Sequence, residues 1–395
     1  MKKSILIVTN KMVMGGIEKS LLSMINSIDN TQYDITVFLT EEGGELRGDL
    51  PKWVNVKVIP NLNASILSRV KNALQRMSIL EAINILYYSI LTKMTSKSYK
   101  GYYYYNKINN RIKKEYDLAI AYHMPISFAT TYIIDNIKAK NKIAYIHFDM
   151  DKYYNMEFGE IILKKYKKYF QKYDKIFCVS SEAKNKFSKY YPELIEKTDI
   201  FYNILDKKSI ELKSLEKCNI KSKENELKIV TVARLASEKG QLIIPSVIKK
   251  LIDNGIGVKW YCIGEGEERV NIEKRIKELN IEDNLILLGM QKNPYSFIRN
   301  CDIYVQTSIY EGFCITLAEA RILNKPIITT NFVGVNDQII NDRNGIIVNY
   351  DENEIYNAIL RLFKNKELQA KFINNLKKNS NDYSEGIKKI YELVN

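Results

Sequence analysis

Histidine and paired cysteines are scarce in this chain, and their scarcity excludes several kinds of site. Among the 395 residues there are only two histidines, which rules out a histidine-rich metal centre. The five cysteines lie singly, and none belongs to a C-x-x-C pair. An odd, unpatterned set of cysteines indicates a reducing, intracellular environment rather than a disulfide framework.

Long apolar runs are also missing. No stretch approaches the roughly eighteen apolar residues that a membrane-spanning helix needs. The first residues, Met1–Val8, begin like a secretory signal, but their apolar core is short and no small-residue cleavage site follows it. We therefore expect Ser4–Thr9 to be a first β-strand and the protein to be cytoplasmic.

The formal net charge of +14 is partly concentrated in one segment. Between Leu62 and Glu115 there are ten lysines and arginines, two acidic residues and the run Tyr102–Tyr105. A second basic run covers Lys164–Lys172 and predicts a basic helix. Such surfaces suit an anionic membrane, which would place the protein at the inner face of the cell membrane, or form a plain solvated face. No nucleic-acid-binding module accompanies them, so we expect no nucleic-acid partner.

Apolar strand-like runs alternate with amphipathic helical patterns along most of the chain, and the length allows two domains. This alternation predicts α/β domains with parallel, doubly wound sheets. The expected strands are Ser4–Thr9, Asp34–Leu39, Val54–Ile59, Asp117–Ala121, Lys142–Ile146, Lys175–Val179 and Thr198–Phe201, then Lys228–Val232, Val258–Ile263, Asn284–Leu288, Asp302–Gln306, Pro326–Thr329 and Gly345–Val348. We expect an N-terminal domain at 1–205, a charged crossing at 206–226, a second domain at 227–380 and a last helix within 381–395.

The stretch Ser308–Ala320 holds two glutamates eight residues apart, in different surroundings. Glu311 lies in the predicted strand-to-helix loop, and Glu319 lies just past the first turn of the helix. The backbone N–H groups near Ile315 and Thr316 would face an anion at the helix N-terminus. Glu319 could then accept hydrogen bonds from a diol, and Glu311 from other hydroxyls, so the pattern fits a nucleotide-sugar.

Two cations follow the first strand of the second domain. Arg234 at the strand end and Lys239 at the next helix start can converge on one anion. Glycine loops after other strands allow close backbone approach to a phosphate, although they also suit ordinary tight turns. These loops contain Gly15 and Gly16, Gly264 and Gly266, and Gly289 followed by Gln291.

The two histidines both follow first-domain strands. His147 ends the strand Lys142–Ile146, at the sheet edge where ligands bind in open α/β sheets. His123 follows Asp117–Ala121, and we place it, with Asp149, on the side of a second substrate, the acceptor of a transferred group. Asp149 and Asp151 form a D-x-D pair, which in other enzymes holds a metal with phosphate oxygens. Here we expect neither a metal nor a cofactor. We expect the two aspartates to contact the acceptor or lysine side chains instead.

These motifs, in this order, resemble family GT4, the retaining glycosyltransferases of the GT-B fold. The resemblance rests on the G-G loop, His147, the R-x4-K-G segment at Arg234–Gly240, the G-x-G loop and the E-x7-E pair. The chain departs from the family at one position, because the family's usual E-G-F-G is E-G-F-C here, with Cys314 in place of the second glycine. It implies two Rossmann-like domains facing across a cleft, with the C-terminal helix returning to the first domain. It implies catalytic roles for His147, Arg234, Lys239 and Glu311. The implied donor-binding residues are Gly16, Arg234, Lys239, Gly264, Gln291, Glu311, Phe313, Cys314, Ile315, Thr316 and Glu319.

The resemblance implies transfer of a hexose-type sugar, with retention, from UDP or GDP to a hydroxyl acceptor. A glycan or lipid-linked acceptor in cell-surface polysaccharide, teichoic-acid or glycolipid assembly would fit. Two alternatives stay open, a catalytically silent subunit that supports a partner glycosyltransferase and a nucleotide-sugar epimerase. The sequence does not determine the sugar, the acceptor, the linkage or the oligomeric state.

Overall fold

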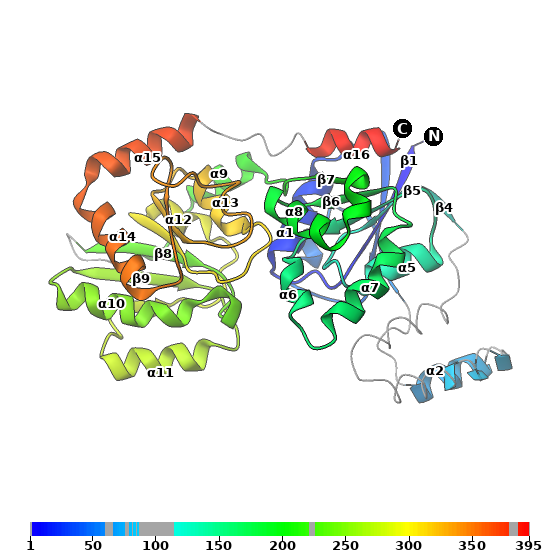
Figure 1. Cartoon of the computed structure of the whole chain (residues 1–395), viewed down its shortest axis with the longest axis horizontal. Helices are drawn as coiled ribbons and strands as arrows, with labels where there is room; N and C mark the ends of the chain where they lie inside the picture. The colour runs from blue at the N-terminus through cyan, green and yellow to red at the C-terminus, as the bar shows by residue number, and fades with distance from the viewer. Residues whose placement is uncertain are drawn as a thin grey trace. The chain divides into compact units, whose positions relative to one another are not determined.

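The structure is a computed structural model, and it describes residues 2–59, 66–75, 79–80, 82–83, 85–86, 114–220, 226–378 and 386–394. The chain forms two compact units: unit 1 is Met1–Ile204 with Tyr383–Asn395, and unit 2 is Leu205–Asp382 (Figure 1). Most of the basic segment between Leu62 and Glu115, with its tyrosine run, lies outside the described residues.

Unit 1 is built on a seven-stranded parallel sheet of order β3-β2-β1-β4-β5-β6-β7. Its strands are β1 (Lys3–Thr9), β2 (Tyr33–Leu39), β3 (Asn55–Val58), β4 (Glu115–Ala121), β5 (Lys138–Ile146), β6 (Lys175–Cys178) and β7 (Thr198–Ile200). Its helices are α1 (Gly16–Asn26), α2 (Ile66–Gln75), α5 (Phe128–Asn136), α6 (Met150–Tyr154), α7 (Gly159–Phe170), α8 (Ser181–Tyr190) and α16 (Gly386–Val394), with short 3-10 turns η1 (Arg47–Asp49) and η2 (Pro192–Lys197).

The last helix, α16, belongs to unit 1 and lies beside the strand that begins the chain (Figure 1). Its Ile390 and Val394 are buried in the same core as Ile5 and Ile7 of β1. The ring of Tyr391 stacks on Tyr33 at 4.8 Å between centroids. Polar contacts add to this packing, because Lys389 Nζ donates to Asp199 Oδ2 at 2.6 Å and Asn141 Nδ2 to the Leu393 carbonyl at 2.8 Å. The expected return of the C-terminal helix to the first domain is confirmed.

Unit 2 contains a six-stranded parallel sheet of order β10-β9-β8-β11-β12-β13. Its strands are β8 (Leu227–Val232), β9 (Val258–Ile263), β10 (Leu285–Leu287), β11 (Ile303–Gln306), β12 (Ile327–Thr330) and β13 (Ile346–Val348). Its helices are α9 (Lys207–Ser214), α10 (Ile244–Asp253), α11 (Arg269–Leu279), α12 (Tyr295–Asn300), α13 (Ile315–Ile322), α14 (Glu352–Lys364) and α15 (Lys366–Lys378), with η3 (Ser237–Lys239) and η4 (Gln241–Ile243).

Alternate residues of the unit 2 strands supply separate cores on the two faces of the sheet, as the period of two requires. Ile229 of β8 and Val305 of β11 pack with α10, α11, α14 and α15. Val230 and Tyr304, one residue away on the same strands, pack with α12 and α13. Helices therefore cover both faces, and the expected doubly wound α/β architecture is confirmed.

The segment 206–226, which we expected to be a weakly patterned crossing, contains helix α9. Asp206 caps this helix by accepting a hydrogen bond from the Ser209 N–H at 3.0 Å. Only Ile210 and Ser214 of α9 are buried, in a segment otherwise rich in charge, so an apolar period was hardly visible in the sequence. The helix packs on α12 and α13 and belongs to unit 2.

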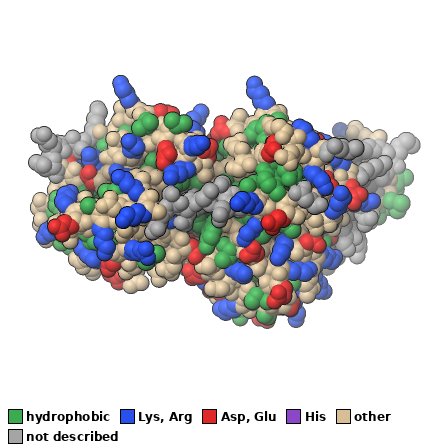
Figure 2. All heavy atoms as spheres, turned by 90° about the horizontal axis from the view of Figure 1, so that it is seen from above, with side chains coloured by type: hydrophobic (Ala, Val, Ile, Leu, Met, Phe, Trp, Pro, Cys, Tyr) green, Lys and Arg blue, Asp and Glu red, His purple; other side chains and the backbone are tan. Residues whose placement is uncertain are grey.

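No helix in the described part of the chain has the length and apolarity needed to cross a membrane. Figure 2 shows lysine and arginine side chains spread over the visible face, with acidic side chains among them.

Candidate functional site

The loop between β11 and α13 carries Glu311 and leads into the buried first turn of α13. β11 ends at Gln306, and α13 begins at Ile315 directly after Cys314. Cys314 has a φ of 63°, the left-handed conformation that side chains other than glycine rarely adopt. The first N–H groups of a helix have no acceptor within the helix, and its dipole is positive there, so this end of α13 favours an anion.

The turn before α13 is fixed from behind by a buried amide. Gln338 Nε2 donates to the carbonyl oxygens of Phe313 and Cys314. Phe313 and Ile315 are themselves buried, so their predicted contribution to a ligand site is through the backbone. The Thr316 hydroxyl lies 3.4 Å from Gln306 Oε1, which keeps it at the end of β11.

The R-x4-K-G segment packs directly against this loop. The Ile309 N–H donates to the Glu238 carbonyl at 2.8 Å, and Thr307 Oγ1 donates to the Lys239 carbonyl at 2.9 Å. Gly240 has a φ of 65°, and a Cβ there would lie 2.2 Å from the Thr307 carbonyl oxygen. Only glycine allows this approach, so the two segments that the sequence singled out separately form one site.

Each predicted anion-binding cation has a carboxylate partner in this structure. Lys239 Nζ donates to Glu311 Oε1 at 2.7 Å, and the two side chains are 18% and 11% exposed. Burial is the largest single influence and would lower the pKa of Lys239, but Glu311, together with Cys314 and Glu238, raises the pKa above its ordinary value. Arg234 Nη2 instead pairs with Glu238 Oε1 at 2.6 Å, with the Arg234 side chain 59% exposed. Lys239 and Glu311 are thus in contact, whereas Arg234 is oriented by a glutamate of its own loop.

Glu319 lies in the second turn of α13 and is only 1% exposed. Its Oε1 accepts a hydrogen bond from the Tyr295 hydroxyl at 3.1 Å. Burial, and then the nearby carboxylate, raise the pKa of Tyr295, so this hydroxyl stays a donor.

Several side chains that contact the predicted residues were not identified from the sequence, among them Ser308, Gln306 and Tyr295. Ser308 Oγ donates to Glu311 Oε1 at 2.8 Å, and Gln306 Nε2 donates to Ser308 Oγ at 2.7 Å. A glutamine in an otherwise apolar buried strand was the one available indication, because buried polar side chains need partners.

The two predicted glycine loops of unit 2 are joined, and the first of them lies against the R-x4-K-G segment. Gly264 has a φ of 145°, and a Cβ on it would lie 1.9 Å from the Ala233 carbonyl oxygen, beside Arg234. The Gly264 N–H donates to the Gly289 carbonyl at 2.9 Å, which joins the two loops. The Gln291 side chain donates to the Leu288 carbonyl at 2.8 Å and so braces its own turn.

In unit 1 the G-G loop opens α1, with Gly16 as its first residue. A Cβ on Gly15 would lie 2.3 Å from Glu18 Oε2, so the Glu18 carboxylate folds back over this end of the helix. Glu18 is buried, and its charge takes the favourable position at the helix N-terminus.

Both histidines follow strands of unit 1, and burial holds both neutral. His147 is 7% exposed and packs against the rings of both Tyr122 and Tyr145, at 4.6 and 5.5 Å between centroids. Its Nε2 is buried and has no hydrogen-bond partner among the described residues. Burial, and then the neighbouring His123, lower the pKa of His147 to about 3. Burial likewise lowers the pKa of His123 to about 4. Nε2 of His147 is therefore a neutral, buried polar group.

The D-x-D aspartates contact lysines. Asp149 is 4% exposed and caps α6, and Lys186 Nζ lies 2.9 Å from Asp149 Oδ2 and 3.1 Å from Asp151 Oδ2. Lys189 Nζ lies 3.3 Å from Asp151, and the Tyr190 hydroxyl donates to the same carboxylate at 2.5 Å. Of the two roles expected for this pair, the structure shows the lysine contacts. Within the described residues, no three acidic, histidine or cysteine side chains gather as a metal site.

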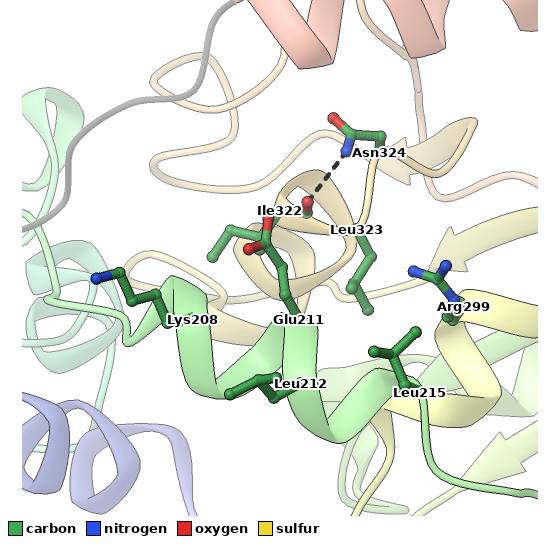
Figure 3. A pocket seen from close by; sticks show the side chains of 8 residues that line it. All are labelled: Lys208, Glu211, Leu212, Leu215, Arg299, Ile322, Leu323 and Asn324. Carbon is green, nitrogen blue, oxygen red and sulfur yellow. Dashed lines mark hydrogen bonds between the residues drawn. The ribbon is translucent and has the colours of Figure 1, made fainter.

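A hollow of about 460 Å³ in unit 2 lies away from these residues (Figure 3). Figure 3 shows its side chains coming from α9, from the end of α12 and from the C-terminal end of α13. They are Lys208, Glu211, Leu212, Leu215, Arg299, Ile322, Leu323 and Asn324. The candidate site is at the opposite end of α13, so no predicted site residue lines this hollow.

Comparison with known proteins gives matches in sequence and in fold. The model of the family described as Glycosyl transferases group 1 matches residues 214–379, within unit 2. An uncharacterized glycosyltransferase of Methanocaldococcus jannaschii is 29% identical over 226 residues, 54% of this chain and 55% of its own length. The N-acetylgalactosamine-N,N'-diacetylbacillosaminyl-diphospho-undecaprenol 4-alpha-N-acetylgalactosaminyltransferase of Campylobacter jejuni is 28% identical over 184 residues, 46% of this chain and 48% of that protein. The chain thus spans about half the length of these curated relatives.

Solved structures match over almost the whole chain. HepE of Anabaena, in complex with UDP and glucose, aligns with a TM-score of 0.72 and 16% identity, covering 99% of this chain and 98% of that one. A TarM mutant of Staphylococcus aureus, in complex with UDP among other ligands, aligns with a TM-score of 0.70 and 16% identity over 100% of both chains. Residues 214–379 are therefore similar to the glycosyl transferases group 1, and the chain as a whole has the GT-B fold.

Proposed function

We propose that the protein is a retaining glycosyltransferase of family GT4 that transfers a hexose-type sugar from a nucleotide-sugar, with UDP as the favoured nucleotide, to a hydroxyl acceptor. The observation that carries this proposal is the joined site of unit 2. There Lys239 and Glu311 meet at 2.7 Å beside the N-terminus of α13. The sequence relatives support it, because their names describe transfer of N-acetylgalactosamine and N-acetylglucosamine to polyprenyl-linked or polyol-phosphate acceptors.

In this proposal the donor diphosphate lies at the N-terminus of α13. Its oxygens accept hydrogen bonds from the first-turn N–H groups and from Lys239, which then shares its charge between Glu311 and the phosphate. Arg234 is exposed and held by a short exchangeable ion pair, so it can turn from Glu238 to the phosphate. Glu311 accepts hydrogen bonds from sugar hydroxyls, and Glu319 from the ribose diol.

The chemistry follows from charge stabilisation. The bond between the anomeric carbon and the diphosphate oxygen breaks, and the acceptor oxygen forms a new bond to that carbon on the same face. The acceptor's proton passes to a departing phosphate oxygen, which gives a glycoside and a nucleoside diphosphate. Lys239, Arg234 and the backbone N–H groups stabilise the negative charge that grows on the leaving group. We propose no metal for this role, since these cations are available.

His147 takes a different part. Because its imidazole is neutral throughout the physiological range, it can exchange hydrogen bonds with a substrate hydroxyl through Nε2 but is unsuited to carry a proton in turnover. We propose that it orients a hydroxyl of the donor sugar or the acceptor. His123 would act beside it, toward the acceptor.

We further propose that the enzyme works in the cytoplasm at the inner face of the membrane, on a glycan or lipid-linked acceptor for cell-surface polysaccharide, teichoic acid or glycolipid. The support is in unit 1, where α2 and the residues after it expose large apolar side chains: Leu67 is 81% and Leu80 77% exposed. Exposed leucines in a strongly basic stretch of sequence suit an anionic lipid surface.

Vesicle flotation tests this location. Wild-type protein should float with phosphatidylglycerol vesicles and remain behind with phosphatidylcholine vesicles. The double change Leu67→Gln/Leu80→Gln should reduce flotation severalfold. Leu212→Gln/Leu215→Gln in unit 2, at leucines of 69% and 64% exposure, is the matched control and should float like the wild type. Equal flotation of both double variants would show that the exposed leucines of unit 1 are a solvated face.

A donor screen tests the activity. Purified protein is incubated with UDP-, GDP- and ADP-sugars, with and without EDTA, while thermal stability and slow hydrolysis are recorded. We expect one nucleotide to raise the melting temperature and its sugar to be hydrolysed equally with EDTA. No shift with any nucleotide would favour a catalytically silent subunit, and conversion of a UDP-sugar to its epimer without acceptor would favour an epimerase.

A further inference from the structure

A row of buried, hydrogen-bonded side chains runs along β11 and the two residues that follow it, and ends on the Glu311 carboxylate. The Tyr304 hydroxyl donates to Gln306 Oε1 at 2.7 Å, and Gln306 Nε2 donates to Ser308 Oγ at 2.7 Å. Ser308 Oγ then donates to Glu311 Oε1 at 2.8 Å. Tyr304, Gln306 and Ser308 are each at most 1% exposed. We call these four residues the Gln306 relay.

The relay lies on the face of the sheet that otherwise builds an apolar core. Residues 304, 306 and 308 alternate along the chain and so point to one side, toward α12 and α13. A branched apolar residue at 306 would fill this position without any need for partners, whereas a glutamine there must have its amide satisfied on both ends. A buried glutamine that joins other polar groups therefore suggests a role beyond packing.

The amide gives the relay one direction. Its oxygen accepts from Tyr304 and, at 3.4 Å, from Thr316 Oγ1, so its NH₂ group faces Ser308. Since the Ser308 oxygen accepts this bond, its single hydrogen goes to Glu311. Each bond polarises the next toward the carboxylate.

The relay and Lys239 act on the same oxygen of Glu311. Lys239 Nζ and Ser308 Oγ both donate to Oε1, at 2.7 and 2.8 Å. Across the described residues Glu311 makes no hydrogen bond through Oε2. The carboxylate is thus held by one oxygen and offers the other.

We propose that Gln306 is a positioning residue for the donor sugar: through Ser308 it fixes the orientation of Glu311 so that Oε2 accepts hydrogen bonds from sugar hydroxyls. This inference rests on the proposed function and adds a determinant of sugar binding, as distinct from nucleotide binding. The contact with Thr316 also joins the relay to the helix end where the diphosphate would lie.

Removal of the amide tests the inference. Gln306→Leu keeps a similar volume and removes all three hydrogen bonds of the side chain, those with Tyr304, Thr316 and Ser308. Calorimetry gives the dissociation constant for UDP, and hydrolysis kinetics give KM for UDP-glucose and UDP-N-acetylglucosamine. We expect binding of UDP, which lacks the transferred sugar that would contact Glu311, to stay within about twofold of the wild type. KM for the sugar that the wild type accepts should rise about tenfold.

Ser308→Ala should give the same selective loss, and the double variant should be no worse than either single one, because both changes break one relay. Thr231→Val is the matched control: it removes a buried hydroxyl that donates to the Val305 carbonyl at 2.6 Å, outside the relay. It should lower the melting temperature but leave the ratio of the sugar KM to the UDP dissociation constant unchanged.

Equal losses for UDP and for the UDP-sugars in Gln306→Leu would overturn the inference in favour of a structural role. Effects of Gln306→Leu and Ser308→Ala that multiply in the double variant would also overturn it. A wild-type protein that binds no nucleotide would refute the proposed function instead, so the two failures are distinguishable.

Discussion

Replacement of Lys239 by methionine separates the two roles of this residue, holding Glu311 and binding the donor diphosphate. Methionine keeps the apolar stem and removes the charge. Glu311, only 11% exposed, then loses its counter-charge and keeps one hydrogen bond, from Ser308. Breaking a buried ion pair costs about 3–5 kcal/mol, and because Ser308 remains we expect the lower end, about 3 kcal/mol.

For a domain of this size, about 2–4 °C is lost per kcal/mol, so the unit 2 transition should fall by about 6–12 °C. Turnover of the nucleotide-sugar should fall about 10²–10³-fold, the usual effect of removing one group that stabilises a developing oxyanion. Differential scanning calorimetry and hydrolysis assays, each on protein shown to be folded by circular dichroism, measure the two effects.

The double variant Lys239→Met/Glu311→Gln distinguishes these roles. Removing the stranded carboxylate should recover much of the lost stability but none of the lost turnover. Lys249→Met is the control, since it breaks an exposed i,i+4 pair with Asp253, at 41% and 53% side-chain exposure, and should cost only about 0.3–0.5 kcal/mol. Turnover restored together with stability would refute a direct role of Lys239 on the diphosphate.

Three further predictions follow from single features of the structure. Since the folded pKa of His147 is about 3 and its ordinary value is 6.5, the unfolded chain binds the proton first on acidification. The contribution of neutral His147 to the free energy of unfolding is therefore complete above pH 6.5 and decreases toward pH 3, with about 2 kcal/mol lost at pH 5. In unfolding titrations against pH, His147→Gln should lack this part of the acid destabilisation. Cys314→Gly should be about 0.5–1 kcal/mol more stable than Cys314→Ala, because both lack the thiol and only alanine keeps a Cβ at a φ of 63°; equal stabilities would contradict the strain. EDTA should leave the turnover of the wild type unchanged, and the turnover of Asp151→Asn should be the same with and without EDTA. A turnover that EDTA lowers and a divalent cation restores would indicate a metal role for the D-x-D pair.

The fold was largely predictable from the sequence because strands buried on both faces appear as continuous apolar runs. Runs such as Ser4–Thr9 and Val258–Ile263 correspond to β1 and β9 within a residue. The helix α9 was missed because a single buried isoleucine among charged residues gives no period. The predicted start of β5 was four residues late, since Lys138–Asn141 extend the strand with mostly polar residues that are exposed or half-buried.

The candidate site was predictable as a set of segments but not as a set of contacts. Spacing indicated that Lys239 and Glu311 belong to loops at the same sheet edge, and the structure joins those loops through Gly240 and Thr307. The spacing in the sequence could not indicate that Arg234 pairs with Glu238, because the partner of a long, flexible side chain depends on which groups lie near it in the folded chain. The partners Gln306 and Tyr295 depend on strand register and helix packing, which single-residue patterns do not encode. The roles that the sequence predicts for Arg234, Lys239 and Glu311 toward a ligand remain predictions.

A crystal structure of the protein with UDP-glucose or UDP-N-acetylglucosamine bound would show directly whether the joined site of unit 2 holds the donor. We expect diphosphate oxygens within hydrogen-bond distance of Lys239 Nζ and of the first N–H groups of α13, with a sugar hydroxyl on Glu311 Oε2 and the ribose on Glu319. A nucleotide-sugar bound elsewhere in the molecule, with the Lys239–Glu311 pair and the α13 N-terminus unengaged, would contradict it.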